Sequence, residues 1–300
     1  MYVITGATGN TGSVVAKHLL AQGEKVRVIG RKTERLQPLV KVGAEPFVAD
    51  LTDVAALTKA FTGAEAVYVM IPPDLNAKDP LADRQRIIDS VAAALAKANV
   101  KRAVSLSSIG ADKPDKTGPV VTLNRLEQKL NAIPGLNVVH LRAGYFMENT
   151  LQQSNPIRAM GQAAGPLRGD LTMPIIATHD IGEAAAAALK KTDFTGHQTH
   201  ELHGQRDLSM NDVTAIIGKG IGKPNLAYVH VADEQVRPVL TQFGMSPKGA
   251  DLLLEMAAAL NSGHMRPLEK RSPQNTTPTS YEDFVAKVFV PVYQGKGQAA

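Results

Sequence analysis

Short apolar runs alternate with longer amphipathic stretches through the first 145 residues. The apolar runs predict β-strands over residues 2–4, 25–29, 45–49, 66–70, 103–107 and 137–141. Between them, apolar positions at helical spacing predict a helix that ends at Gly23 and further helices over 33–42, 53–61, 81–98 and 121–132. This alternation predicts an α/β fold with a doubly wound parallel sheet of the Rossmann type. The loops that follow the strands then meet at one edge, where ligands bind.

The alternation breaks after residue 145. Residues 145–169 contain several glycines and prolines and predict mostly loop with one short helix. A strand and a helix over 173–192 are expected to return to the sheet, with Asp180 capping the helix. We therefore predict an NAD(P)-binding Rossmann domain over 1–145 with 173–192, and a smaller C-terminal α/β substrate lobe over 146–172 and 193–300. The glycine-rich end, 294–300, is expected to fray.

A glycine motif, GATGNTG, joins the first strand to the first helix at residues 6–12. Strand, glycine turn and helix together are the setting in which such a motif binds a dinucleotide. Gly6 permits a sharp turn, Gly9 leaves room for a pyrophosphate at the helix N-terminus, and Gly12 lets the helix pack closely on the strand. The residues expected to contact the cofactor here are Gly6, Thr8, Gly9, Asn10, Thr11 and Gly12.

The residues after the second strand indicate which dinucleotide is preferred. Arg31 and Lys32 follow that strand, and no carboxylate occurs before Glu34. An acidic residue at this place binds the ribose hydroxyls of NAD(H), whereas a basic one pairs with the 2′-phosphate of NADP(H). We therefore expect NADP(H) to be preferred over NAD(H). The simpler alternative is that Arg31 is only a surface cation.

Two further strand ends complete the expected cofactor site. Asp50 and Leu51 follow the third strand and are expected to lie against the adenine. The alternative for Asp50 is a cap on the following helix. Ile71 and Pro72 follow the fourth strand and are expected to line the nicotinamide half of the site.

Three longer motifs point to a family: SSIG at 107–110, LRAGYFMEN at 141–149 and HDIG at 179–182. Together with the glycine motif, they make the chain resemble the NmrA-like branch of the atypical short-chain dehydrogenase/reductase superfamily, most strongly over the first 190 residues. The resemblance implies a substrate pocket walled by Tyr145, Phe146 and Asn149, with Pro73 beside it. For the two aromatic residues, packing within the lobe is the alternative.

Tyrosine-dependent members of that superfamily use a YxxxK pair on the helix after the fifth strand to move a proton. If Glu127 matches the glutamate that usually follows the lysine, Pro119 and Leu123 stand at the two positions. Neither side chain transfers a proton, so a carbonyl reduction would lose the ~10²- to 10⁴-fold that general acid catalysis supplies. Quinones and similar electrophiles need no such acid, and quinone reductases that resemble this branch also lack the pair.

Two serines end the fifth strand at the expected nicotinamide position. Ser107 is expected to lie at the cofactor, and Ser108 is the candidate catalytic residue because its hydroxyl could bond to an acceptor oxygen. The alternative is that both hydroxyls satisfy local backbone groups.

Composition narrows the possible partners. The chain of 300 residues has no cysteine, which excludes disulfides and thiolate metal sites. Its net charge of +5 comes from scattered basic residues, so no nucleic-acid partner is expected. No apolar run is long enough to span a membrane, and the first strand begins at residue 2, so we expect a cytoplasmic protein.

The histidines do not suggest a metal site. His197, His200 and His203 lie three residues apart on a predicted strand, which places neighbours on opposite faces. His140, alone in an apolar strand, is expected to be a core residue with its hydrogen bonds satisfied.

We therefore expect an enzyme, an NADPH-dependent oxidoreductase that reduces small conjugated electrophiles such as quinones by direct hydride transfer, without flavin or metal. The alternative is a redox sensor of the NmrA type that binds NADP(H) without turnover. A closed apolar pocket at the nicotinamide favours the enzyme, and an exposed apolar patch on the lobe favours the sensor. An isoflavone-reductase-like enzyme is less favoured, because such enzymes generally keep the lysine that Leu123 replaces.

Overall fold

The computed structural model describes residues 1–296; residues 297–300, the last part of the tail expected to fray, lie outside the described residues. Its centre is a sheet of seven parallel strands in the order β10-β6-β5-β4-β1-β2-β3. The order reverses direction between β1 and β4, which confirms the predicted doubly wound sheet. The strands are β1 (Tyr2–Ile4), β2 (Val26–Gly30), β3 (Glu45–Val48), β4 (Ala66–Val69), β5 (Arg102–Ser108), β6 (Asn137–Ala143) and β10 (His197–Leu202).

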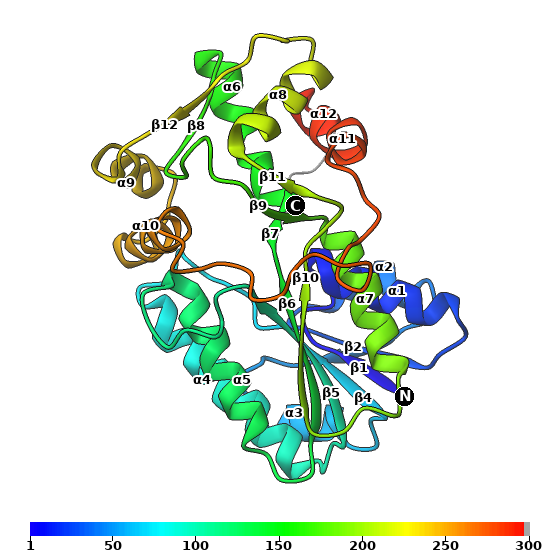
Figure 1. The fold of residues 1–300 in the computed structure, drawn as a ribbon. Helices are drawn as coiled ribbons and strands as arrows, with labels where there is room; N and C mark the ends of the chain where they lie inside the picture. The colour runs from blue at the N-terminus through cyan, green and yellow to red at the C-terminus, as the bar shows by residue number, and fades with distance from the viewer. Residues whose placement is uncertain (297–300) are drawn as a thin grey trace.

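Helices cover both faces of the sheet (Figure 1). One face packs against α1 (Asn10–Ala21), α2 (Thr33–Val40) and α7 (Thr178–Lys190). The other face packs against α3 (Val54–Phe61), α4 (Pro80–Lys97) and α5 (Val121–Asn131). Strand β1 illustrates the division: Ile4 packs with the first group and Val3 with the second, because successive strand residues point to opposite faces.

The remaining elements form a lobe at the carboxyl edge of the sheet (Figure 1). It contains two small sheets, β11-β9-β7 and β12-β8, and has its own apolar core. None of the described helices has both the length and the apolar character needed to cross a membrane. The elements of the lobe are β7 (Tyr145–Phe146), the 3-10 helix η2 (Met147–Gln153), α6 (Ser154–Met160), β8 (Ala163–Gly165), β9 (Met173–Ile176), β11 (Asp207–Leu208), α8 (Met210–Gly220), β12 (Tyr228–His230), α9 (Asp233–Gln242), α10 (Pro247–Asn261), α11 (Tyr281–Phe284), the π-helix η3 (Val285–Phe289) and α12 (Val290–Tyr293).

The structure corrects three expectations about the lobe. Strand β9 does not return to the main sheet, because β10 occupies the place beside β6. Strand β9 pairs instead with β7 and β11, although α7, which follows it, does pack on the main sheet. Strand β10, expected in the lobe, therefore completes the Rossmann sheet. The segment 145–169 is mostly regular, because β7, η2, α6 and β8 lie within it.

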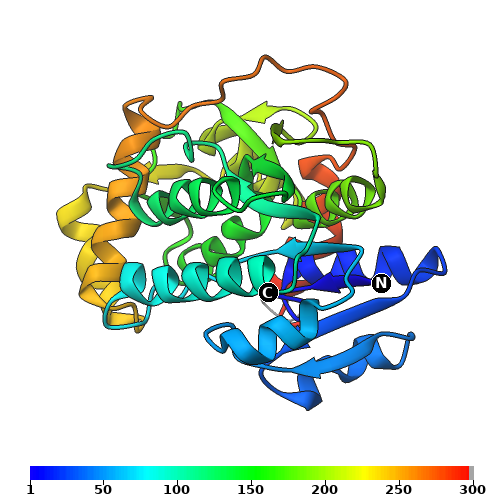
Figure 2. The same cartoon turned by 90° about the horizontal axis from the view of Figure 1, so that it is seen from below.

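Helix α10 connects the lobe to the sheet domain and lies at the N-terminal ends of α4 and α5 (Figure 1 and Figure 2). It packs on the 3-10 helix η1 (Gly118–Val120), where a Cβ atom on Gly118 would lie 2.0 Å from the carbonyl oxygen of Leu252. The N–H of Gly118 also donates to Glu255, at 3.2 Å. Ahead of α10, the Ser246 hydroxyl donates to the carbonyl of Leu75, at 2.9 Å, and so holds the loop after β4.

A buried polar chain links β5 to β6. Ser105 Oγ lies 2.6 Å from Nδ1 of His140, and Nε2 of His140 lies 2.9 Å from Oδ1 of Asn131. Burial lowers the pKa of His140 to about 4, so its ring is neutral at pH 7. The expectation of a core histidine with satisfied hydrogen bonds is therefore confirmed.

This neutral histidine makes stability depend on pH. The unfolded chain protonates His140 near pH 6.5, whereas the folded protein does so only near pH 4. Between these values the unfolded state binds more protons, so the free energy of unfolding falls as pH falls, by about 3 kcal/mol over that range. We expect His140→Gln to remove this part of the pH dependence, measured by urea unfolding between pH 4 and pH 7.

His230→Gln, at an exposed histidine on β12, is the matched control and should keep the wild-type pH dependence. A His140→Gln protein with an unchanged slope would contradict the assignment of a neutral buried ring.

Candidate functional site

In the glycine turn after β1, the backbone of α1 packs directly against the backbone of the turn. Gly6 has a φ of +61°, a left-handed conformation that glycine adopts without strain. A Cβ atom on Gly12 would lie 2.3 Å from the carbonyl oxygen of Gly6, so α1 rests directly on the turn. The N–H of Gly9 donates to that same carbonyl, at 3.0 Å. The structural roles expected of Gly6 and Gly12 are therefore confirmed.

The N-terminus of α1 carries no side-chain cap. Gly9 occupies the N-cap position, and the first turn holds no acidic residue. Thr8 and Asn10 are exposed beside it. The N–H groups of a first helical turn have no partner within their helix, and together with the helix dipole they attract an anion. The residues present therefore fit the pyrophosphate of a dinucleotide.

A buried threonine that the sequence analysis missed holds this turn against β4. Thr5 Oγ1 donates to the carbonyl of Tyr68, at 3.0 Å, and accepts from the N–H of Met70, at 2.8 Å. The Tyr68 phenol in turn donates to Thr11 Oγ1, at 3.1 Å, in the core. The Thr11 hydroxyl thus faces inward, which leaves its backbone N–H for the expected cofactor contact.

The ends of β2 and β3 bring a basic pair close to a carboxylate. Arg31 and Lys32 are both exposed. Asp50 Oδ1 accepts from the N–H of Thr52, at 2.8 Å, and from its hydroxyl, at 2.6 Å. These bonds lower the pKa of Asp50, and the charge of Arg31 contributes a smaller part. The charge of Arg31 therefore acts on the carboxylate of Asp50, although no ion pair joins the two among the described residues.

The helix after β3 is capped by a different residue from the one considered. Asp53 is the N-cap of α3, and its carboxylate accepts from the N–H of Ala56, at 2.9 Å. The alternative of Asp50 as a helix cap is therefore wrong, since the N-cap lies three residues further along the chain. Leu51 is half-buried against the core on that face.

The end of β4 is shaped by prolines and by an arginine of α4. Ile71 is buried, whereas Pro72 and Pro73 are exposed. The Arg84 guanidinium reaches the carbonyl of Ile71, with 3.5 Å between Nη2 and the oxygen. Nothing in the sequence around Arg84 suggested this position, because a helix of this length carries several charged residues.

A buried ionic network occupies the end of β5. The Ser107 hydroxyl donates to Glu127 Oε1, at 2.6 Å. Arg142 donates to both carboxylate oxygens of Glu127, at 3.0 and 2.6 Å. These hydrogen bonds raise the pKa of Arg142 further above its ordinary value. The Ser107 hydroxyl is thereby engaged in holding β5, β6 and α5 together.

Ser108, the candidate catalytic residue, is half-buried, and its hydroxyl donates to the carbonyl of Ile109, at 2.9 Å. Pro119 lies in η1 and is buried, and Leu123 is half-buried against the core. The Ser108 hydroxyl thus bonds to a neighbouring backbone group, as the alternative had it, whereas the Ser107 hydroxyl bonds to a side chain of α5. A contact of Ser108 with an acceptor stays a prediction.

The residues expected to form the pocket wall follow β6, and their side chains pack against different parts of the molecule. On β7, Phe146 packs against the core of the main sheet and Tyr145 packs against the core of the lobe. Burial raises the pKa of Tyr145 to about 12, so its phenol stays protonated at neutral pH. Asn149 is exposed in η2. Tyr145 and Asn149 therefore remain the candidates for a pocket wall, with Phe146 behind them.

The start of α7 uses an acid other than the expected one. The carboxylate of Glu148 accepts from the N–H of Thr178, the first residue of α7, at 3.1 Å, and burial raises the pKa of Glu148. Asp180 accepts instead from the N–H of Thr279, at 3.0 Å. The expected cap role of Asp180 is therefore wrong, because the helix already includes it.

The ring of His203 lies 2.8 Å from Glu201 at one edge of the main sheet, and both side chains are buried. His197 and His200 are exposed. Among the described residues, no group of three or more histidine, cysteine or acidic side chains is arranged to hold a metal ion.

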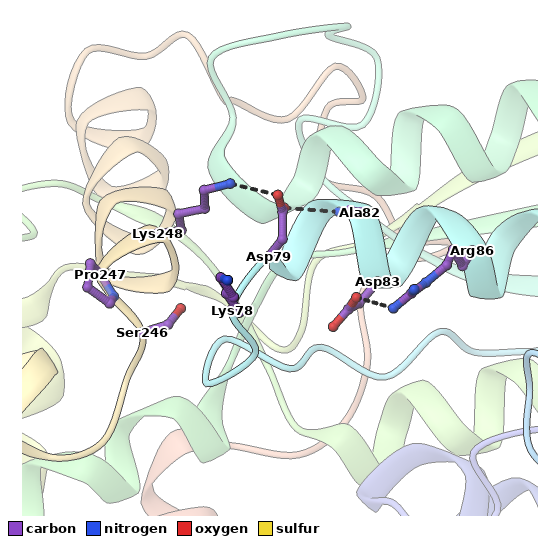
Figure 3. Close-up of a pocket in the computed structure, with 8 residues that line it drawn as sticks. All are labelled: Lys78, Asp79, Ala82, Asp83, Arg86, Ser246, Pro247 and Lys248. Carbon is purple, nitrogen blue, oxygen red and sulfur yellow. Dashed lines mark hydrogen bonds and ion pairs between the residues drawn. The ribbon is translucent and has the colours of Figure 1, made fainter.

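A hollow of about 610 Å³ opens between the first turns of α4 and α10 (Figure 3). Lys248 bonds to Asp79 across it, at 2.6 Å, and Arg86 pairs with Asp83. None of the residues expected at the site lines this hollow. Its lining residues are Lys78, Asp79, Ala82, Asp83, Arg86, Ser246, Pro247 and Lys248.

Comparison with known proteins places the chain among reductases. The model of the NmrA-like family matches residues 2–284. The chain is 28% identical over 263 residues to a (4-alkanoyl-5-oxo-2,5-dihydrofuran-3-yl)methyl phosphate reductase of Streptomyces griseus, a match that covers 88% of each chain. It is 26% identical over 267 residues to quinone oxidoreductase 2 of Escherichia coli, which covers 88% of this chain and 89% of that one.

Solved structures agree in fold. An NADPH-dependent quinone oxidoreductase from Escherichia coli, crystallised with NADPH, has a TM-score of 0.82 at 24% identity, over 96% of this chain and 100% of that one. The triphenylmethane reductase of a Citrobacter species, complexed with NADP(H), has a TM-score of 0.78 at 18% identity, over 96% of this chain and 100% of that one.

Thr5 offers a test of how the glycine turn is held. Thr5→Val keeps the shape of the side chain but leaves the N–H of Met70 without its acceptor, so we expect the free energy of unfolding to fall by about 1–3 kcal/mol. Binding of NADPH should weaken as well, because the turn loses its tie to β4. Urea unfolding and a fluorescence titration with NADPH measure the two effects. Thr5→Ser, which keeps the hydroxyl, is the control, and a valine variant as stable as the wild type would refute this role.

Proposed function

The chain belongs to the NmrA-like family, and we propose that it is an NADPH-dependent oxidoreductase that reduces small conjugated electrophiles, quinones first. The observation that carries the proposal is the uncapped N-terminus of α1 behind the glycine turn, with Arg31 and Lys32 at the end of β2. The named relatives that are reductases support the same chemistry.

In this proposal the turn from Gly6 to Gly12 holds the pyrophosphate, and Arg31 and Lys32 hold the 2′-phosphate. Ile71 and Pro72 form the wall at the nicotinamide. When bound, NADPH would supply the hydride. The protein itself positions the two reactants, because bringing reacting groups into near contact can supply much of the rate enhancement.

No enzyme acid is part of this mechanism. The side chains of Pro119 and Leu123 have no acidic proton to donate. The acceptor must therefore be electrophilic without protonation, as quinones and other conjugated carbonyl compounds are. The pocket is proposed to lie between Pro73, Ser108, Tyr145 and Asn149, beneath a substrate lobe formed by the elements from β7 to β9 and from β11 to α12. The proposed enzyme uses no flavin or metal, acts in the cytoplasm, and has small molecules as partners rather than nucleic acid or membranes.

A second candidate is a sensor that binds NADP(H) without turnover. Exposed apolar side chains on the lobe favour it: α9 has no buried residue, Val239 within it is 48% exposed, and Phe243 at its end is 78% exposed. These side chains are available to a protein partner.

One assay separates the two functions. The protein is mixed with NADPH or with NADH, and absorbance at the nicotinamide band is followed with and without a simple benzoquinone. Quinone-dependent oxidation of NADPH that is much slower with NADH supports the reductase. Tight binding of NADPH with no oxidation by any conjugated acceptor overturns it in favour of the sensor, and binding of neither dinucleotide overturns both.

Arg31 tests the cofactor preference. Arg31→Ala removes a charged partner of the 2′-phosphate, so we expect the affinity for NADPH to fall about 10- to 100-fold and that for NADH to change little. Fluorescence titration with each dinucleotide measures this. Arg35→Ala, at another exposed arginine on α2, is the control, and equal losses for both dinucleotides would rule out a 2′-phosphate contact.

A further inference from the structure

Arg84 is a buried positive charge without a negative partner. Its side chain is 5% exposed, and no carboxylate among the described residues pairs with it. Two buried carboxylates have a basic partner, and a third, that of Asp180, accepts hydrogen bonds from the N–H and hydroxyl of Thr279. Glu127 pairs with Arg142 at 2.6 Å, and Glu201 pairs with His203 at 2.8 Å. Burial of an unpaired charge is costly, and the donors of Arg84 are not all satisfied, so its burial needs an explanation beyond packing.

The guanidinium uses few of its donors. Nη1 donates to the carbonyl of Pro119, at 3.1 Å, and Nη2 to that of Ile71, at 3.5 Å. Nε is buried and has no hydrogen-bond partner among the described residues. Because a guanidinium carries five N–H donors, Arg84 retains capacity to bond to a further acceptor.

The two carbonyls place this charge at the proposed reaction centre. Ile71 is the residue proposed to wall the nicotinamide, and Pro119 stands where tyrosine-dependent relatives keep their acid. Burial lowers the pKa of Arg84 to about 10, which still leaves it charged at neutral pH. A cation surrounded by protein rather than water acts strongly on a charge that develops nearby.

We propose that Arg84 is a specificity-determining residue whose fixed charge selects neutral acceptors that become oxyanions, and disfavours acceptors that are already cations. This rests on the proposed function. A quinone that takes a hydride and its two electrons from NADPH becomes a hydroquinone monoanion, NADPH is oxidised to NADP⁺, and the monoanion then takes a proton from water. Arg84 thus supplies by charge what Pro119 and Leu123 cannot supply by proton transfer.

The binding test does not depend on turnover. 4-Nitrophenol, whose absorbance reports its ionisation, is titrated against the protein saturated with NADP⁺ at several pH values. We expect the wild type to bind the phenolate about 10- to 100-fold more tightly than the phenol, as a hydrogen bond to a charged group would give. Arg84→Gln should lose this preference and Arg84→Lys should keep much of it.

The matched control is Arg86→Gln, which removes an exposed arginine from the same helix and should behave as the wild type. Arg84→Met, which fills similar volume without donors, replaces the glutamine variant if that variant does not fold. A wild type that binds both forms equally or neither form overturns the inference, as does a neutral variant that still prefers the phenolate.

Turnover supplies the second measurement. With Arg84→Gln we expect kcat for a benzoquinone to fall about 10- to 100-fold, and kcat for crystal violet, a cationic dye, to stay within about twofold or to rise. If kcat falls equally for both acceptors and the melting temperature is lowered, Arg84 has only a structural role, and the inference is overturned. A wild type that binds the phenolate through Arg84 but turns over no quinone would refute the proposed function, and with it a role of Arg84 in reduction, while supporting an oxyanion-binding site at Arg84.

Discussion

The contact between Gly12 and the carbonyl of Gly6 is the constraint on which the site depends. Because a Cβ atom on Gly12 would lie only 2.3 Å from that oxygen, the first turn of α1 rests on the chain that leaves β1. This closeness directs the free N–H groups of α1 toward the space above the carboxyl edge of the sheet. Thr5 hydrogen-bonds the same turn to β4, so the first turn of α1 and the end of β4 are held in a fixed arrangement.

The alternating strands and helices and the glycine turn could be predicted from the sequence, because both depend on residues that are close together in the chain. Strand alternation identified β1 to β6, and three glycines at fixed spacing identified the turn. The sequence did not predict contacts between residues that lie far apart in the chain. The place of β10 beside β6 depends on a pairing that periodicity does not encode, and the start of α7 is capped by Glu148, thirty residues away.

Side-chain roles at the site divide in the same way. The place of Arg31 and Lys32 after β2 could be predicted from the strand pattern, and their contact with a 2′-phosphate stays a prediction. The role of the Ser107 hydroxyl could not be predicted, because it bonds to Glu127, a residue of the next helix. No sequence pattern distinguishes Arg84 from the other charged residues of α4. Its importance lies in what surrounds it, carbonyl oxygens in place of a carboxylate, and that is a property of the folded chain alone.

The chain passes through part of the lobe before it supplies β10, the last strand of the main sheet. On a ribosome, the edge of β6 therefore stays open while residues 144 to 196 are being made, and it is closed only when β10 emerges. The main sheet and the lobe are thus interleaved along the chain rather than joined end to end. An exchange of lobes between relatives, by recombination or by design, would have to carry both the segment before β10 and the segment after it.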